Sequence, residues 1–148
     1  MRECKTGQHV LVTGAASGIG RAIAQAWQAE GGRVVGLDIN AGDTGACEII
    51  PVDLAAPHAV ADAVRQAAAR LDGRLDVVVN CAGIMLEQEL AQITQQALDL
   101  TLAVNLRAPV LVAQAALPFM GAGGCILNMA SERADLGRAG ASLYCATK

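Results

Sequence analysis

The sequence predicts a doubly wound α/β fold, in which helices cover both faces of a parallel sheet. Short apolar runs alternate with segments of helical periodicity along the 148 residues, and no repeat or low-complexity tract interrupts them. The short runs are apolar on both faces, as is typical of parallel strands between two helical layers. Hydrophobic residues make up 53% of the chain, which indicates a packed globular protein, and its length fits one domain, residues 1–148.

Five apolar runs are the predicted strands, because each is too short for a helix and most contain β-branched residues. They span residues 10–12, 34–37, 49–52, 77–79 and 125–127. Right-handed crossovers would place the carboxyl ends of these strands along one edge of the sheet, where we expect a ligand to bind.

Three longer segments predict helices, at residues 18–30, 57–71 and 95–120. The first places Ile19, Ile23 and Trp27 at helical spacing. Pro57 suits the first turn of the second helix, and Thr94 is a candidate N-cap for the third. A helix is missing or short before one of the strands.

Composition argues against nucleic-acid and membrane binding. The net charge of −3 provides no basic surface, and three scattered aromatic residues cannot form a stacking platform. Residues 108–131 carry no charge and are long enough to cross a bilayer, but Pro109, Pro118 and the glycines of 121–124 interrupt them. We therefore expect a helix end followed by a buried strand there.

The five cysteines are odd in number and lack C-x-x-C spacing. Because the polar start of the chain does not resemble a signal peptide, we interpret them as reduced thiols of a cytoplasmic protein. No metal ligand is assigned.

Residues 13–20, Thr-Gly-Ala-Ala-Ser-Gly-Ile-Gly, join the first predicted strand to the first helix. Glycine permits a tight turn and lets backbone N–H groups approach a pyrophosphate at the positive end of the helix. Glycine clusters also simply mark turns, but this one stands between a strand and a helix, as phosphate binding requires. We predict that Gly14, Gly18 and Gly20 belong to a phosphate-binding loop.

Asp38 ends the second predicted strand, 18 positions after Gly20. This spacing is close to that of a carboxylate that binds the adenosine ribose, although Asp38 could also be only a turn former. A carboxylate there would repel a 2′-phosphate, and no Arg or Lys in the glycine loop or directly after Asp38 would attract one. We therefore expect NAD rather than NADP.

Polar residues also follow the third and fourth predicted strands. Asp53 and Asn80 end these strands at the ligand edge, although either could serve only to cap a loop. Gly83 would let the chain pass close to a ribose. We interpret Cys81 as a packed residue rather than a nucleophile, because no His lies near it in the sequence.

Ser131 ends the fifth predicted strand, and Tyr-Cys-Ala-Thr-Lys follows at 144–148. On a helix, Tyr144 and Lys148 would share one face because they are four residues apart. A free tyrosine has a pKa of about 10, and a nearby ammonium would lower that pKa by favouring the phenolate. Such a pair is usually only one face of an amphipathic helix, but here it follows a glycine loop and a serine that could hold a substrate oxygen.

Together these motifs resemble those of the classical short-chain dehydrogenases/reductases. The matching residues are Thr13-Gly-x-x-x-Gly-x-Gly20, Asp53, Asn80-x-Ala-Gly83, Asn105, Ser131 and Tyr144-x-x-x-Lys148. They cover the chain from residue 8 to residue 148, and Cys81 is a mild departure from the second asparagine usual in the family. The resemblance implies a Rossmann-type fold, an NAD(P) cofactor and a small alcohol or ketone substrate.

The resemblance also implies a role for each site residue. Tyr144 would exchange a proton with the substrate, while Lys148 would lower the pKa of Tyr144 and hold the nicotinamide ribose. Ser131 would orient the reacting oxygen, and Asn105 would support a water-linked proton relay. Ser17, Ile19, Leu54 and Ala82 would contact the cofactor beside the residues already named.

Asn105 can also be interpreted from its neighbours alone. It follows Leu102 on the apolar stripe of the third predicted helix, so it should point inward, where a bare amide is costly. Pro109 has no N–H, so the carbonyl of Asn105 lacks its usual helical partner and is free to accept from a relay water. The alternative is a kink beside a core asparagine.

Members of the family continue with two further strands, their helices and a substrate loop. We therefore expect this chain to be a fragment of a homo-oligomeric enzyme and, alone, to be inactive or weakly active. One alternative is a non-catalytic nucleotide-binding module. Another, a Rossmann-like methyltransferase, would not explain why Ser131, Tyr144 and Lys148 occur together.

Overall fold

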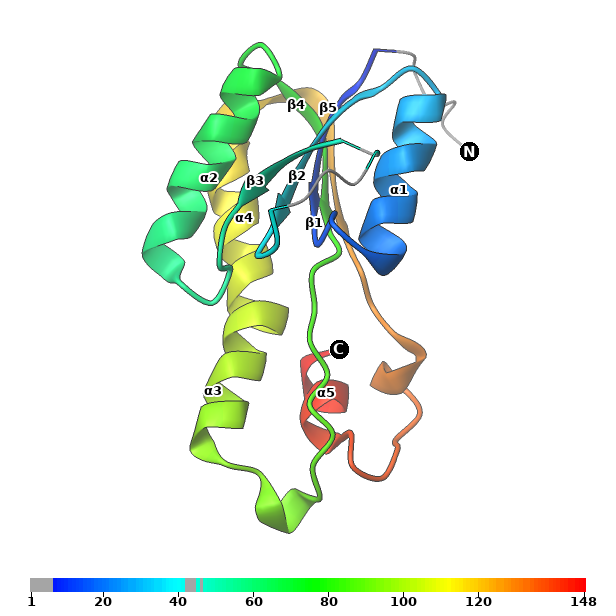
Figure 1. Ribbon diagram of the computed structural model, residues 1–148, viewed down its shortest axis with the longest axis vertical. Coiled ribbons are helices and arrows are strands. Elements are labelled where there is room, and N and C mark those ends of the chain that lie inside the picture. Colours follow the sequence, from blue (N-terminus) through cyan, green and yellow to red (C-terminus); the bar gives the residue numbers. More distant parts are fainter. Residues whose placement is uncertain (1–6, 42–44, 46) are drawn as a thin grey trace.

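The computed structural model describes residues 7–41, 45 and 47–148, so Cys4 lies outside the described residues. Five parallel strands form one sheet in the order β3-β2-β1-β4-β5 (Figure 1). Their bounds are β1 His9–Thr13, β2 Arg33–Asp38, β3 Glu48–Pro51, β4 Leu75–Asn80 and β5 Met120–Asn128. All five predicted strands are present, and the parallel sheet with its helices confirms the predicted fold class.

Helices cover both faces of the sheet (Figure 1). α1, Gly18–Ala29, packs on one face, and α2, Pro57–Arg70, packs on the other together with α4, Ala108–Ala116. α3, Gln95–Leu102, and α5, Ser142–Thr147, lie beyond the carboxyl ends of the strands. The described residues also form short 3₁₀-helical turns at η1 Leu90–Gln92, η3 Leu117–Phe119 and η4 Glu132–Ala134.

Alternating side chains of the strands fill two apolar layers. Val10 and Val12 of β1 pack towards α1, whereas Leu11 between them packs towards α2 and α4. Each of these side chains is fully buried, and burying one such side chain contributes about 1.5–3 kcal/mol. The two-faced burial explains why the strand sequences are apolar at successive positions.

Local signals fix the starts of two helices as predicted. Pro57 occupies the first turn of α2, where its missing N–H costs nothing. The hydroxyl of Thr94 accepts a hydrogen bond from the Ala97 N–H at 3.1 Å and so caps α3.

The third predicted helix runs from Gln95 to Phe119, but it is not α-helical throughout. Residues Ala103–Arg107 form a π-helical turn, η2, whose cap hydrogen bond runs from the Ala108 N–H to the Ala103 carbonyl. Pro109 cannot donate to Asn105, and the wider turn is one way to accommodate that missing bond. Within the described residues this helix alone is long and apolar enough to cross a membrane, a test that core helices of soluble proteins also pass.

One prediction about strand burial and two about strand ends were wrong. The fifth strand is exposed rather than buried, because β5 is the edge of the sheet; Leu127 is 45% exposed. Ser131 lies beyond the end of β5 and caps the turn η4 instead, through a hydrogen bond from the Arg133 N–H at 3.2 Å. Asp53 lies two residues beyond β3, where its carboxylate accepts from the Ala55 N–H at 2.8 Å.

The order of the strands places a crevice at the carboxyl edge of the sheet. β2 and β3 lie on one side of β1, and β4 and β5 lie on the other. The loops that follow β1 and β4 therefore diverge, and ligands of open α/β sheets bind at such a point.

Candidate functional site: a cavity between the glycine loop and the Tyr144–Lys148 pair

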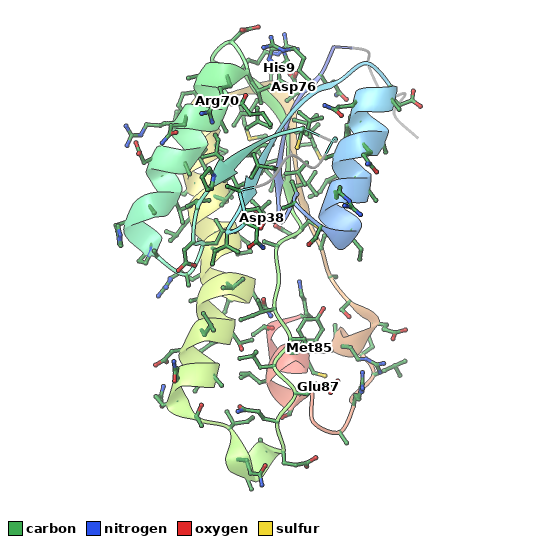
Figure 2. The ribbon with its side chains drawn as sticks, in the orientation of Figure 1. His9, Asp38, Arg70, Asp76, Met85 and Glu87 are labelled. Atoms are coloured by element: carbon green, nitrogen blue, oxygen red, sulfur yellow. The ribbon has the colours of Figure 1, made fainter. Side chains whose placement is uncertain are left out.

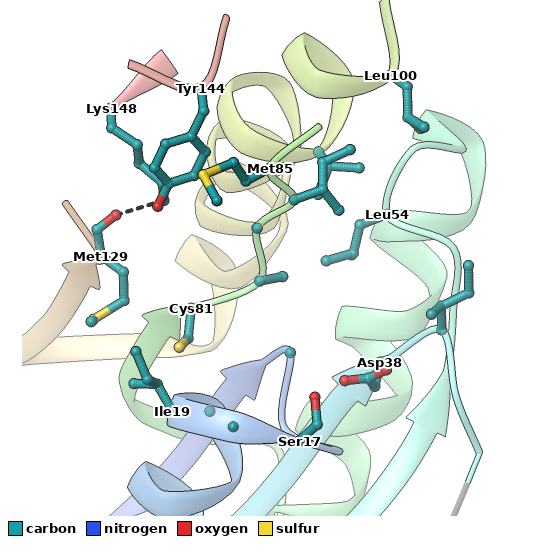
Figure 3. Close-up of a pocket in the computed structure, with 18 of the residues that line it drawn as sticks. Ser17, Ile19, Asp38, Leu54, Cys81, Met85, Leu100, Met129, Tyr144 and Lys148 are labelled. Carbon is teal, nitrogen blue, oxygen red and sulfur yellow. Dashed lines mark hydrogen bonds between the residues drawn. The ribbon is translucent and has the colours of Figure 1, made fainter. Parts of the chain in front are cut away.

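A cavity of about 600 Å³ occupies this crevice (Figure 3). The predicted cofactor residues that line it are Gly14, Ser17, Gly18, Ile19, Gly20, Asp38, Asp53, Leu54, Ala82, Gly83, Tyr144 and Lys148. Asn80 and Asn105 instead line a neighbouring cavity of about 440 Å³, which also reaches Lys148. Ser131 lines neither of these two cavities.

The glycine loop is shaped by close backbone contacts. Gly14 has a φ of 70°, and a Cβ there would lie 2.9 Å from the Cα of Ala82. A Cβ on Gly20 would overlap the carbonyl oxygen of Gly14. Only glycine fits these two positions, because both the turn and the neighbouring segment leave no space for a side chain.

The start of α1 is open towards the cavity. Ser17 is the N-cap residue, but its side chain makes no capping hydrogen bond, and the first turn contains no acidic residue. The backbone N–H groups at this positive helix end are therefore available to an anion. This end of the cavity can accommodate the phosphates of a dinucleotide.

Asp38 joins the second strand to the glycine loop. Its Oδ2 accepts from the Ala16 N–H at 3.0 Å, and its Oδ1 accepts from the Asn40 N–H at 2.9 Å. The side chain is buried but still lines the cavity, as Figure 3 shows. Each carboxylate oxygen has a second lone pair, so both can also accept from ribose hydroxyls.

Asn80 ties strand ends together rather than facing the main cavity. Its Nδ2 donates to Oδ1 of Asn128, its partner on β5, at 2.9 Å. The loop after Asn80 is held by Thr13, whose hydroxyl accepts from the N–H groups of Cys81 and Ala82 at 3.1 and 3.0 Å. The position of Thr13 at the end of β1, opposite Asn80, could have indicated this role from the sequence.

Tyr144 and Lys148 lie at the other end of the same cavity (Figure 3). Lys148 directly follows α5, and its Nζ lies 5.8 Å from the centroid of the Tyr144 ring, so the two side chains lie together as predicted. The same Nζ donates to the carbonyl of Met129 at 2.8 Å. The cavity thus brings an ammonium beside a phenol, across from the glycine loop.

Asn105 projects inward from the π-helical turn and is buried, as predicted. Its amide pairs with the backbone of Ile84: Nδ2 donates to the Ile84 carbonyl at 2.8 Å, and Oδ1 accepts from the Ile84 N–H at 2.8 Å. Nδ2 also donates to Oγ1 of Thr147 at 3.0 Å. The side chain therefore links the π turn, the loop after β4 and α5.

Two further features bear on the chemistry of the cavity. Burial raises the pKa of the Cys81 thiol, and the nearby Lys148 only partly opposes this, so the thiol is uncharged at neutral pH. Lys148 is the only cationic group among the described residues that line the cavity. Several apolar lining residues were not singled out from the sequence, because nothing distinguishes them from core residues there: Ile39, Val52, Ile84, Met85, Leu100, Val104 and Met129.

Known proteins resemble this chain over nearly its whole length. A family model described as short chain dehydrogenase matches residues 8–148. D-threitol dehydrogenase of Mycolicibacterium smegmatis is 40% identical, sorbitol dehydrogenase of Cereibacter sphaeroides 39% and L-xylulose reductase of Bos taurus 36%. Each alignment covers 96% of this chain and 59–60% of the relative.

Solved structures give the same result. A short-chain dehydrogenase from Burkholderia cenocepacia in complex with NADP superposes with a TM-score of 0.90 at 37% identity, over 97% of this chain and 63% of that one. A blue fluorescent protein from a metagenomic library, in complex with NADPH, gives 0.89 at 35% identity, over 97% and 64%. The chain therefore spans less than two thirds of these proteins, and it belongs to the short-chain dehydrogenase family.

Proposed function

We propose that the protein containing this chain interconverts a secondary alcohol and a ketone with NAD(P) as the cofactor. The observation that carries this proposal is the single cavity that joins the glycine loop and Asp38 at one end to Tyr144 and Lys148 at the other. One end suits the phosphates and ribose of a dinucleotide, and the other places a proton-transferring group beside a cation.

The cofactor would be held by the residues that line the cavity from the glycine loop to Gly83. The open start of α1 binds the phosphates, Asp38 binds the adenosine ribose, and Asp53 and Leu54 flank the adenine side. Asn80 would act indirectly, by holding the strand end that leads into Ala82 and Gly83. When bound, the nicotinamide ring accepts or donates the hydride.

Residues of the chain itself would carry out the proton transfer. Tyr144 exchanges a proton with the reacting oxygen, and Lys148 beside it would bind the nicotinamide ribose. Ser131 lies outside the two cavities in this structure, but its hydroxyl only accepts, from the Arg133 N–H, so its own hydrogen is left to orient the reacting oxygen of a bound substrate. Asn105 uses its side chain to hold Ile84 and Thr147, and its backbone carbonyl remains the candidate for a proton-relay water.

We infer that the substrate is a polyol or the corresponding ketose. The relatives described above act, by their names, on D-threitol, sorbitol and L-xylulose. A further relative at 37% identity is galactitol 2-dehydrogenase of Agrobacterium fabrum. All four names refer to small polyhydroxylated molecules with an alcohol or carbonyl carbon to oxidise or reduce.

We propose NAD rather than NADP as the preferred cofactor. Asp38 is a fixed carboxylate in the cavity, and its charge would repel a phosphate on the adenosine ribose. Lys148, the only cation that lines the cavity within the described residues, lies at its opposite end. Two similar solved structures contain NADP or NADPH, so the proposal makes cofactor preference a point of difference from them.

We further propose a cytoplasmic enzyme that assembles as a homo-oligomer. No disulfide joins the four cysteines within the described residues, as expected in a reducing compartment. Leu106, Val110 and Leu117, on the long helix, are each more than half exposed and provide apolar surface for a second copy. Light scattering after size-exclusion chromatography should give a multiple of the monomer mass, and a strictly monomeric protein would contradict the proposal.

The proposed activity is tested by following NADH formation with a panel of polyols and other secondary alcohols. Tyr144→Phe should lower kcat by at least about 100-fold while NAD affinity changes little, because the phenol transfers a proton and contributes little to binding. Lys148→Ala should lose both turnover and NAD affinity. Cys145→Ala is a matched control on the same helix and should retain activity.

The possible results separate the alternatives. NAD binding without turnover of any alcohol would favour the non-catalytic nucleotide-binding module. A Tyr144→Phe variant with near-normal kcat would remove Tyr144 from the mechanism, and a protein that binds neither NAD nor NADP would contradict the whole proposal.

A further inference from the structure

The hydroxyl of Thr147 lies where the π-helical turn meets the helix of the Tyr144–Lys148 pair. Its Oγ1 donates to the Tyr144 carbonyl at 2.8 Å and accepts from Asn105 Nδ2 at 3.0 Å. Thr147 itself does not line the main cavity but lines the neighbouring one, beside Asn105 and Lys148. One hydroxyl therefore connects the backbone of Tyr144 to a buried amide on another element.

That amide is itself firmly anchored. Asn105 is 6% exposed, and its remaining hydrogen-bonding groups pair with the N–H and the carbonyl of Ile84 at 2.8 Å each. Three separate segments thus meet through two side chains: the loop after β4, the π turn and α5. Buried, fully paired networks of this kind fix a single geometry more firmly than exposed contacts do.

The helix that carries Tyr144 needs such an anchor. α5 contains only six residues, Ser142–Thr147, and its N-cap residue, Ala141, provides no side-chain capping bond. A helix of this length does not persist through its own backbone hydrogen bonds, so its position depends on contacts with its surroundings. The Lys148 bond to Met129 holds the end of the segment, and Thr147 holds the turn that contains Tyr144.

We propose that Thr147 is a positioning residue, which holds Tyr144 in its reactive place by tying the carbonyl of Tyr144 to the Asn105 amide. This inference rests on the proposed function, because it concerns the same proton-transferring tyrosine. Displacing a reacting group by about 1 Å can lower a rate by about 100-fold, so a modest movement of α5 is enough to matter. Cofactor affinity depends mainly on the glycine loop and Asp38, and should change much less than turnover.

Two substitutions of Thr147 and one matched control test this role. Thr147→Val keeps the shape of the side chain but removes both hydrogen bonds, and should lower kcat about tenfold or more with the KM for NAD changed less than about threefold. Thr147→Ser restores the hydroxyl and should recover most of the wild-type kcat. Thr101→Val removes a buried hydroxyl whose hydrogen bond, to the Ala97 carbonyl at 2.8 Å, stays within α3, and should leave kcat near wild type.

Amide hydrogen exchange provides a readout that does not depend on turnover. Residues 141–148 should exchange faster in Thr147→Val than in the wild type or in Thr101→Val, because α5 loses its anchor. Unchanged kcat and unchanged exchange in Thr147→Val would overturn the positioning role, as would an equal loss of kcat in Thr147→Ser. A wild-type protein without turnover would contradict the proposed function alone, and the exchange comparison would still decide the role of Thr147.

Discussion

Asp38 illustrates how a single side chain can serve both the fold and a ligand. Its two oxygens accept from Ala16 in the glycine loop and from Asn40 after β2, so the carboxylate keeps one position while it lines the cavity. A carboxylate held in this way cannot swing aside for a phosphate. The same bonds therefore shape the glycine loop and set the proposed cofactor preference.

Replacing Asp38 with Ala should relax the preference for NAD, because it removes the charge that repels the 2′-phosphate. We expect the ratio of kcat/KM for NAD to that for NADP to fall about tenfold or more, the value of one lost charged contact of about 1.4 kcal/mol. Asp62→Ala, which removes an exposed carboxylate on α2, serves as the control and should leave the ratio unchanged. Equal use of both cofactors by the wild-type protein would show that Asp38 does not discriminate between them.

Some of the site residues could be predicted from the sequence, and others could not. Gly14, Asp38, Tyr144 and Lys148 were predictable because strand–loop–helix order and a four-residue spacing place them without knowledge of any distance. Thr147 lies between motif residues, but its hydrogen bond with Asn105 joins residues 42 positions apart, so no local sequence pattern predicts this bond. Such long-range hydrogen bonds depend on tertiary packing, and the sequence contains no signal for them.

Among the helices and strands, the π-helical turn Ala103–Arg107 is hydrogen-bonded to segments at both ends of the cavity. From its inner side Asn105 reaches Ile84 and Thr147, and from its outer side Arg107 donates from Nη2 to the Ala55 carbonyl at 2.7 Å. Ala55 belongs to the turn that begins at Asp53, which lines the cavity. π-helical turns occur frequently at functional sites, and this one connects the proposed nucleotide end of the cavity to the end that contains Tyr144 and Lys148.

Arg107→Met should therefore weaken cofactor binding more than it affects the chemical step. Arg107 is exposed, so we expect only about a threefold rise in the Kd for NAD, with kcat unchanged. Isothermal titration of NAD would measure the change, and Arg65→Met, which removes an exposed arginine on α2, is the matched control. A loss of kcat without any change in Kd would mean that Arg107 acts on α5 instead.

Two features of the helices and strands could not be predicted from the sequence: the type of turn in the long helix and the edge position of β5. The missing N–H of Pro109 indicated a broken hydrogen-bond pattern near Asn105, but it did not distinguish a kink from a π turn, because both relieve the same conflict. β5 is apolar enough for a buried strand, yet it is the sheet edge in this structure. Edge position follows from strand order, which sequence periodicity does not contain.

At the scale of the whole molecule, the strand order creates the site. Because β2 and β4 both neighbour β1, the glycine loop and the loop after β4 flank one crevice, and Thr13 connects the end of β1 to the loop after β4. Met85 and Glu87 lie on the segment after β4 that passes beside α5 (Figure 2), and Met85 lines the cavity together with Leu100 of α3. An ion pair between Glu87 and Arg138, at 2.9 Å, joins the loop after β4 to the loop before α5.

The central claim is that this cavity supports hydride transfer between an alcohol and NAD(P), assisted by Tyr144. The most direct measurement uses a polyol deuterated at the reacting carbon and follows the label by mass spectrometry of the nicotinamide cofactor. We expect one deuterium on the cofactor that the wild-type protein reduces, and at least about 100-fold less labelled cofactor in the same time with Tyr144→Phe. Reduced cofactor without deuterium, or equal labelling with Tyr144→Phe, would contradict the account.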